Sequence, residues 1–248
     1  MTVRLLGYVV NEGTVARGLS PGERMIIEID HPVARDLLTR LRDRRTPPSE
    51  FSRHARSLGY ILATEATRGL RTSPRVIQTP LEEMLGEVCP DQPVLMVVLR
   101  AGLALLEPFR DLLPDSPVGF AAVRRIESTA EPVWYYDSVP ETAGRRIFVL
   151  DPMLATGGTA ESVVRFLRKR GAGQVTVVSI VAAPEGVASV RKHGDVAVIT
   201  ASVDRELDSR WYIRPGLGDC GERLFSGLPD SAPASGPAEA TRGGGSAR

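Results

Sequence analysis

The stretch VLDPMLATGGTAESVV at residues 149–164 contains the end of an apolar run, a loop with two adjacent glycines and the start of an amphipathic segment. The apolar run before Asp151 has the length of a buried strand. The segment 161–170 then places its apolar residues on one helical face. A strand, a short loop and a helix in this order form the repeating unit of an α/β fold.

Four further apolar runs of strand length surround this unit, and segments with helical spacing separate them. The runs lie at residues 94–99, 118–123, 175–182 and 196–200, and the helical segments at 102–113 and 184–192. Short apolar strands that alternate with helices indicate a parallel sheet covered on both faces. The sequence therefore predicts an α/β fold with a doubly wound, mostly parallel sheet and helices on both faces.

The two ends of the chain differ from this central region. Residues 1–30 are predicted to be an N-terminal extension that closes with the short strand RMIIEID. Helical spacing follows at 34–45 and 50–70. Residues 227–248 contain a single large apolar residue and cannot bury enough surface to fold, so we expect a disordered tail. The main domain is thus predicted to span residues 31–226.

The composition limits the functional classes to consider. The 248 residues include 31 Lys or Arg and 30 Asp or Glu, which leaves a formal net charge of +1. This balance does not predict a nucleic-acid or membrane surface, so anion binding has to be local. The N-terminus has neither the length of a transmembrane span nor the layout of a signal peptide. Cys89 and Cys220 form no CxxC motif, which favours a reducing, cytoplasmic setting.

The loop at residues 155–159 (ATGGT) is suited to bind a phosphate group. Small residues let an anion approach the backbone, successive N–H groups can surround it, and the helix dipole favours negative charge. Asp151 follows its strand at the carboxyl end, where parallel sheets bind ligands, and can accept ribose hydroxyls or hold a magnesium-bound water. The structural alternative is an ordinary strand-to-helix turn with Thr159 as the N-cap.

The sequence Asp151-Pro152-Met153 followed by LATGGT resembles the phosphoribosyl diphosphate (PRPP) loop of the uracil phosphoribosyltransferase family. Other segments resemble the same family in the same order, over most of the chain from about His31 to Phe225. They are LRAGL at 99–103, a flexible arm that contains Arg125, the turn at 181–186 and the loop at 212–219. The resemblance implies the type I phosphoribosyltransferase fold. It also implies transfer of a phosphoribosyl group from PRPP to N1 of uracil, giving UMP and diphosphate in pyrimidine salvage.

The resemblance also implies which residues form the site. Those expected to bind PRPP are Arg100, Arg125, Asp151, Met153, Ala155, Thr156, Gly157, Gly158 and Thr159. Those expected to bind uracil are Tyr212, Ile213, Gly216, Leu217, Gly218 and Asp219.

Three residues are assigned catalytic roles. Arg100 and Arg125 are expected to stabilise the leaving diphosphate, because a guanidinium group binds phosphate oxygens in pairs. Arg100 also directly follows a predicted buried strand. Asp219 is expected to orient the base or to help remove its N1 proton, directly or through water. The alternatives are a turn-capping role for Asp219 and plain core packing for Tyr212.

The same resemblance predicts cofactors and partners. Mg²⁺ is expected as the cofactor, held mainly by PRPP itself, because the sequence offers no dedicated metal site. The polar arm at 124–145 is expected to close over the site, to form a dimer contact, or both. A homodimer or a higher homo-oligomer is expected, with a nucleotide effector as a further candidate ligand and no membrane or nucleic-acid partner.

Two departures from the family pattern keep other functions open. Glu222 stands where the family usually has Asp, and Thr64 stands where it has an aromatic residue. They motivate a second hypothesis, transfer to another pyrimidine-like base in specialised metabolism. A third hypothesis is a regulator of the same fold that binds nucleotides or RNA through the arginines of residues 35–45. The first interpretation of those arginines is a solvated helix face on which Asp36 pairs with Arg40.

Overall fold

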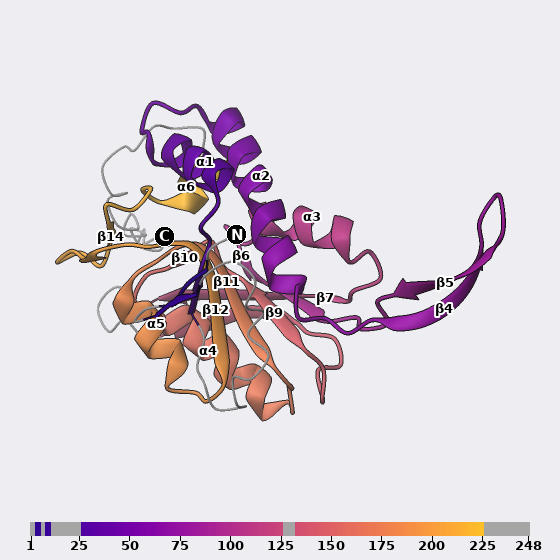
Figure 1. The fold of residues 1–248 in the computed structure, drawn as a ribbon. Coiled ribbons are helices and arrows are strands. Elements are labelled where there is room, and N and C mark those ends of the chain that lie inside the picture. The colour runs from indigo at the N-terminus through magenta and orange to yellow at the C-terminus, as the bar shows by residue number, and fades with distance from the viewer. Residues whose placement is uncertain (1–2, 6–7, 11–25, 126–131, 226–248) are drawn as a thin grey trace, which may run out of the picture.

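The computed structural model describes residues 3–5, 8–10, 26–125 and 132–225, with side chains described for 26–123 and 138–225. Its centre is a ten-stranded sheet in the order β2-β1-β3-β12-β11-β9-β6-β7-β8, with β10 paired to β11 (Figure 1). The strands are β1 (Val3–Leu5), β2 (Tyr8–Val10), β3 (Ile26–Glu28), β6 (Val94–Leu99), β7 (Val118–Arg125), β8 (Pro132–Ser138), β9 (Ile147–Leu150), β10 (Met153–Leu154), β11 (Val175–Ala182) and β12 (Val196–Val203).

The strands from β3 to β7 in this order run parallel, whereas β1, β2 and β8 pair antiparallel at the two edges. Every residue of β9 and β11 is buried. Strands that are apolar throughout require cover on both faces, and the helices provide it. The predicted doubly wound, mostly parallel α/β fold is confirmed.

One face of the sheet carries α1 (Pro32–Arg42), α2 (Pro48–Thr67) and α3 (Leu103–Leu112), and the other carries α4 (Gly158–Lys169) and α5 (Pro184–Arg191). The short helix α6 (Cys220–Phe225) packs against α2 (Figure 1). The α1 helix begins two residues before the predicted segment 34–45 and ends three residues before its end. The side chain of His31 accepts a hydrogen bond from the Val33 N–H and Pro32 occupies the first turn, which starts the helix at Pro32.

The hairpin formed by β4 (Ser73–Gln78) and β5 (Glu83–Val88) was not predicted from the sequence. It stands away from the rest of the molecule (Figure 1). Its apolar side chains are exposed on both strands rather than turned towards a core, so no buried face produces a clean alternation. The predicted arm contributes β8, which pairs antiparallel with β7, and a second small sheet joins β13 (Glu206–Leu207) to β14 (Ile213–Arg214).

Several predicted segments fall wholly or partly outside the described residues. They are the tip of the arm at 126–131, most of the N-terminal extension and the tail at 227–248. Within the described ranges, β1 extends the main sheet by pairing Arg4 with Glu28 of β3. A search of the described helices finds none with the length and apolar character needed to span a bilayer.

Candidate functional site

The phosphate loop lies between β10 and α4 at the carboxyl end of β9. Gly157 caps α4 with φ +82°, and no side chain caps the helix, so the alternative that made Thr159 the N-cap is wrong. A Cβ on Gly157 would meet the Gly186 carbonyl oxygen and the Ser189 Cβ at 2.7 Å each. The loop therefore requires glycine here for two reasons, the left-handed backbone and the lack of space.

A cavity of about 260 Å³ opens at this loop. Its lining residues are Val98, Leu99, Val123, Asp151, Met153, Leu154, Ala155, Gly157, Thr159 and Ala160. The structure thus brings five of the residues predicted to bind PRPP to one cavity, together with the ends of β6 and β7. This position matches the rule that parallel sheets bind ligands beyond the carboxyl ends of their strands.

The turn that follows β11 packs against the phosphate loop. The Gly186 backbone touches Ala155 and Leu154 so closely that any side chain there would collide with their carbonyl oxygens. Glu161 of α4 accepts hydrogen bonds from Ser189 at 2.5 Å and pairs with His193 at 2.8 Å. Burial alone would raise the pKa of Glu161, but these two partners hold the pKa below its ordinary value. The loop is therefore fixed to α5.

Arg100 lies in the turn between β6 and α3. Gly102 in this turn packs against the carbonyl oxygens of Leu150 and Val98, which leaves no space for a side chain and ties the turn to β9. The Arg100 side chain is exposed, with its guanidinium carbon 6.0 Å from the centre of the Phe225 ring. Arg100 therefore lies beside the cavity rather than in its lining. Arg125 ends β7, two residues beyond Val123, and its side chain lies outside the described residues.

The loop at residues 212–219, which we call the base loop, extends from β14 to α6. Ile213 and Leu217 are buried, whereas Tyr212 is 43% exposed. Tyr212 therefore does not pack in the core of the chain, and its predicted contact with the base stays a prediction. The Oδ1 of Asp219 accepts a hydrogen bond from the Glu222 N–H at 2.9 Å, so the capping role expected as the alternative is present. In the part of the chain that the structure describes, Oδ2 of Asp219 has no hydrogen-bond partner.

The elements next to the base loop and the phosphate loop meet at Cys220, which directly follows the base loop. The Cys220 N–H lies 3.4 Å from Sδ of Met153. Burial raises the pKa of the Cys220 thiol to about 12, and the negative charges of Asp219 and Asp151 add to this shift. The two carboxylates are thus close enough to Cys220 to act on it. The structure places the two predicted subsites, for PRPP and for the base, next to each other.

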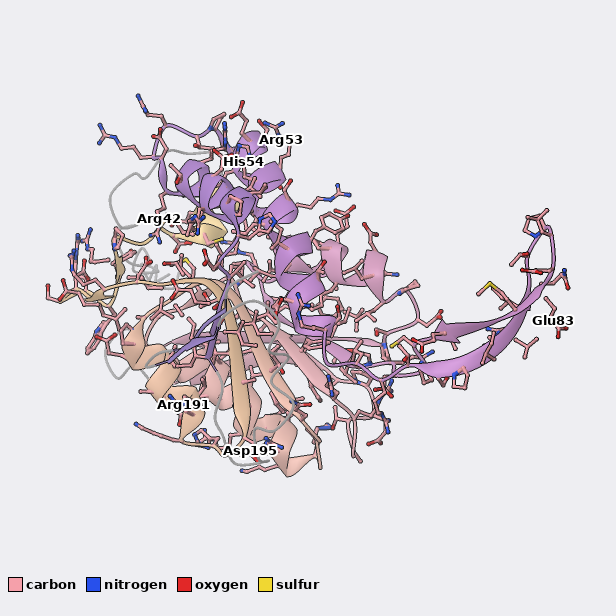
Figure 2. The ribbon with its side chains drawn as sticks, viewed as in Figure 1. Arg42, Arg53, His54, Glu83, Arg191 and Asp195 are labelled. Carbon is pink, nitrogen blue, oxygen red and sulfur yellow. The ribbon has the colours of Figure 1, made fainter. Side chains whose placement is uncertain are left out.

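Three residues at the base loop were missed by the sequence analysis. Arg42 of α1 forms a bidentate pair with Asp204 and also donates to the Gly216 carbonyl oxygen, and Arg223 donates to the Leu217 carbonyl oxygen. The interpretation of residues 35–45 as a solvated face is wrong for Arg42, whose side chain is 22% exposed (Figure 2). It is confirmed for Arg40, which pairs with Asp36 at the surface.

The described residues contain no group of three or more His, Cys, Asp or Glu side chains arranged to hold a metal ion. Cys89 and Cys220 are both free thiols, the first exposed and the second buried.

Comparisons with known proteins identify the family of this chain. The family described as uracil phosphoribosyltransferase matches residues 28–227. The uracil phosphoribosyltransferase of Pseudarthrobacter chlorophenolicus is 43% identical over 202 residues, which cover 79% of this chain and 96% of the relative. That of Streptomyces coelicolor is 44% identical with the same coverage. Among solved structures, the AQ2163 protein from Aquifex aeolicus is 33% identical with a TM-score of 0.78, over 82% of this chain and 98% of that one.

Proposed function

This chain belongs to the uracil phosphoribosyltransferase family and transfers the phosphoribosyl group of PRPP to uracil, and from that premise we propose how its residues share the reaction. The products are UMP and diphosphate. The observation that carries the proposal is the contact of Cys220 with Met153, which puts the base loop beside the phosphate loop. In this arrangement, uracil bound at the base loop is the nucleophile, and it lies next to the ribose of PRPP bound at the phosphate loop.

In the reaction, the bond from ribose C1 to the diphosphate oxygen breaks, N1 of uracil bonds to C1, and the N1 proton leaves. Positive charge develops on the ribose and negative charge on the diphosphate, so positioning and cations matter more than a protein nucleophile. We assign the 5′-phosphate to the loop of residues 155–159, whose N–H groups and helix dipole favour an anion. Arg100 and Arg125 are assigned to the diphosphate.

Base recognition is assigned to the backbone of the base loop. Within the described chain, the N–H groups of Leu217 and Gly218 donate to no protein acceptor, so they are available to a ligand. Uracil offers a carbonyl acceptor at position 4 and an N–H donor at position 3, and cytosine inverts both. The mismatch would leave buried groups unpaired at about 1–3 kcal/mol each. We assign Asp219, through its Oδ2, to the N1 proton.

We propose that Mg²⁺ enters with PRPP. Asp151 is the only carboxylate among the residues that line the phosphate-loop cavity. Such a site fits a metal ion that the substrate carries, because Mg²⁺ keeps several waters and binds through substrate phosphates. Asp151 would hold one of those waters or the ribose hydroxyls. The ion supplies charge neutralisation of the diphosphate when bound.

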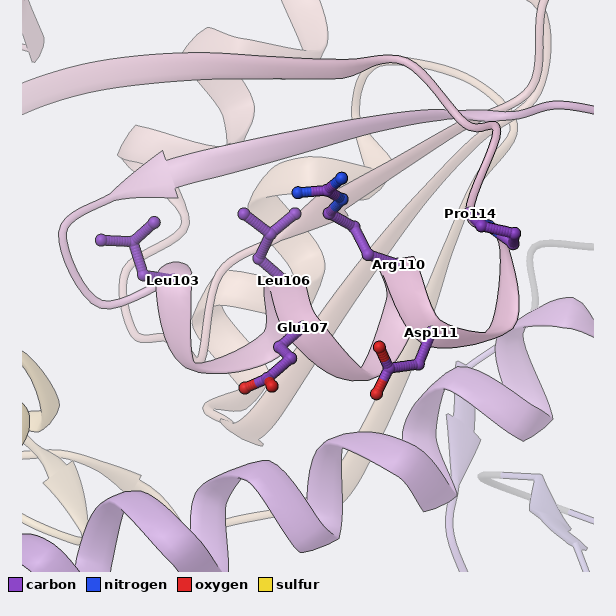
Figure 3. Close-up of a pocket in the computed structure, with 6 residues that line it drawn as sticks. All are labelled: Leu103, Leu106, Glu107, Arg110, Asp111 and Pro114. Atoms are coloured by element: carbon purple, nitrogen blue, oxygen red, sulfur yellow. The ribbon is translucent and has the colours of Figure 1, made fainter.

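We propose that the chain forms a homodimer through the β4–β5 hairpin. Val76, Ile77, Leu81, Met84 and Leu85 expose their side chains on this hairpin, and an isolated two-stranded hairpin is only marginally stable in water. On the same side of the molecule, α3 bears a groove of about 460 Å³ (Figure 1). Leu103 and Leu106, which line the groove, point away from α2, whereas Glu107 and Asp111 point towards α2 (Figure 3). A second copy related by twofold symmetry would cover both surfaces.

A cytoplasmic location is proposed because both cysteines are free thiols, as expected in a reducing compartment.

A nucleotide effector stays a prediction. The basic face needed by the regulator hypothesis is reduced, because Arg42 is engaged within the fold and Arg40 and Arg45 pair with neighbouring carboxylates. Arg44 is exposed. Transfer to another base rests on Thr64, exposed on α2, and on Glu222, exposed on α6, and the comparisons do not favour it.

The test is product formation with PRPP, Mg²⁺ and a panel of uracil, cytosine, orotate and hypoxanthine, read by mass spectrometry. UMP from uracil alone is expected. Asp151→Asn is expected to reduce the rate by about 100-fold, since a positioning contact in the site is lost. Asp115→Asn, at an exposed carboxylate after α3, is the matched control and should keep the wild-type rate. Turnover only with another base would overturn the assignment of uracil.

A further inference from the structure

Arg42 and Asp204 form a bidentate ion pair between α1 and the residue that follows β12. The two terminal nitrogens of Arg42 lie 2.8 and 2.5 Å from the two carboxylate oxygens of Asp204. The Asp204 side chain is 2% exposed, and its own N–H donates to the Ala182 carbonyl oxygen at the end of β11. Burial alone would raise the pKa of Asp204, but the hydrogen bonds and charge of Arg42 lower it. The pair is therefore a fixed point, anchored to the main sheet.

Both backbone polar groups of Gly216 are bound to this pair. The Gly216 N–H donates to Oδ2 of Asp204 at 2.8 Å, and the Gly216 carbonyl oxygen accepts from Nη1 of Arg42 at 2.8 Å. Gly216 has φ +64°, and a side chain there would collide with the Ile213 carbonyl oxygen. The turn of the base loop is thus held in one conformation by two side chains that lie outside the loop.

A second arginine holds the next residue of the loop. Nη1 of Arg223 donates to the carbonyl oxygens of Leu217, at 2.8 Å, and of Leu41, and Nη2 donates to that of Asp43 at 2.7 Å. The guanidinium carbon also lies 4.1 Å from the centre of the Phe51 ring. Arg42 and Arg223 together fasten the base loop to the C-terminal end of α1.

These contacts fix the orientation of the backbone N–H groups of Leu217 and Gly218. The carbonyl oxygens of Gly216 and Leu217 are used by the fold, whereas within the described chain the N–H groups of Leu217 and Gly218 are not. The Gly216 carbonyl oxygen shares a peptide plane with the Leu217 N–H, and the Leu217 carbonyl oxygen shares one with the Gly218 N–H, so a rotation of either peptide would turn its N–H group away from a bound base. Guanidinium suits the fastening role because it donates in a plane to three acceptor atoms at once.

We propose that Arg42, acting through Asp204 and Gly216, is a positioning residue that sets the geometry of the base loop and thereby the affinity for uracil. The inference rests on the proposed function and deepens it. It gives the α1 helix a role in uracil binding that acts through the backbone of the base loop.

The test compares Arg42→Lys with Arg40→Lys. Lysine at position 42 keeps the positive charge near Asp204 but cannot donate to both carboxylate oxygens and to Gly216 in one plane. We expect the KM for uracil to rise by at least about tenfold, which corresponds to one lost hydrogen bond of ordinary strength. The KM for PRPP and kcat should change less than about threefold. Arg40 lies on the same helix, is paired only at the surface, and its variant should match the wild type.

A second variant protects the test against a folding defect. Asp204→Asn keeps the shape and the acceptor for Gly216, so it should fold and show the same selective rise in KM for uracil, to a smaller extent. Equal rises in the KM values for both substrates, or no rise for uracil in a folded Arg42→Lys protein, would overturn the inference and leave a purely structural ion pair. Failure of the wild-type chain to form UMP would instead refute the proposed function.

Discussion

The backbone nitrogen of Cys220 lies 3.4 Å from Sδ of Met153, so the residue that follows the base loop contacts the short strand that precedes the phosphate loop. Met153 belongs to β10, which pairs with β11, and Cys220 begins α6. Because each loop is held by different neighbours, changes in one need not move the other. Substitutions in the two loops should therefore have separable effects on the two substrates, and the first two predictions use this separation.

Gly157→Ala is expected to reduce activity by at least about 100-fold, chiefly through the KM for PRPP. The new Cβ would meet the Gly186 oxygen and Ser189 at 2.7 Å, and a displacement of about 1 Å in a binding loop is enough for such a loss. Gly194→Ala is the matched control. Gly194 also has a positive φ, +90°, but the space around it is open, so this variant carries the backbone strain without the collision. Equal activities of the two variants would contradict the predicted loop geometry.

Asp219→Asn is expected to lower kcat by roughly 100-fold without lowering the melting temperature. Asparagine caps a helix as well as aspartate does, so the bond from the Glu222 N–H is kept. What is lost is the acceptor for a proton, and general base catalysis contributes about 100-fold or more. Steady-state kinetics and thermal unfolding of the same samples check both parts. An unchanged kcat would restrict Asp219 to its capping role.

The stability of the chain should fall in acid partly through Asp204. Its folded pKa is lowered, so the ion pair stabilises the fold fully above the unfolded pKa of about 3.9 and loses this effect as the pH falls through the folded value. Asp204→Asn should therefore lower the free energy of unfolding by about 1–3 kcal/mol at pH 7 and by less at pH 3. Urea unfolding at both pH values measures the difference. A penalty that does not change with pH would show that the lowered pKa contributes nothing.

The hairpin should control the oligomeric state. Val76 and Leu85 lie opposite each other in the β4–β5 pairing, so the double variant Val76→Lys with Leu85→Glu removes the apolar surface but keeps a favourable cross-strand pair. Sedimentation velocity is expected to give a dimer for the wild type and a monomer for this variant. Glu83 lies on the same hairpin (Figure 2). Glu83→Gln is the control and should remain dimeric. A monomeric wild type would refute the proposed interface.

Much of the sheet could be predicted from the sequence because its strands are apolar throughout. The runs at β6 and β11 match the predicted boundaries. The β4–β5 hairpin escaped prediction because its apolar residues face outward, where no core imposes a pattern.

The candidate site also has a part that could be predicted from the sequence and a part that could not. The phosphate loop could be recognised because its glycines and its place after a strand are local features. Arg42 could not be distinguished from its neighbours, because helical spacing reports which face a residue lies on but not that Asp204 meets it from the distant end of β12. Contacts between residues far apart in the sequence leave no local signal. Helical spacing alone therefore groups Arg42 with the solvated arginines.

The two loops also differ in what fixes them. At the phosphate loop, the backbone at Gly157 and Gly186 packs so closely against its neighbours that lack of space excludes a side chain at either position. Arginine and aspartate side chains hold the base loop, and side chains can be exchanged one at a time without rebuilding the fold. The side chains that hold the base loop are consequently open to stepwise replacement, whereas Gly157 and Gly186 accept a side chain only if the surrounding backbone is rebuilt.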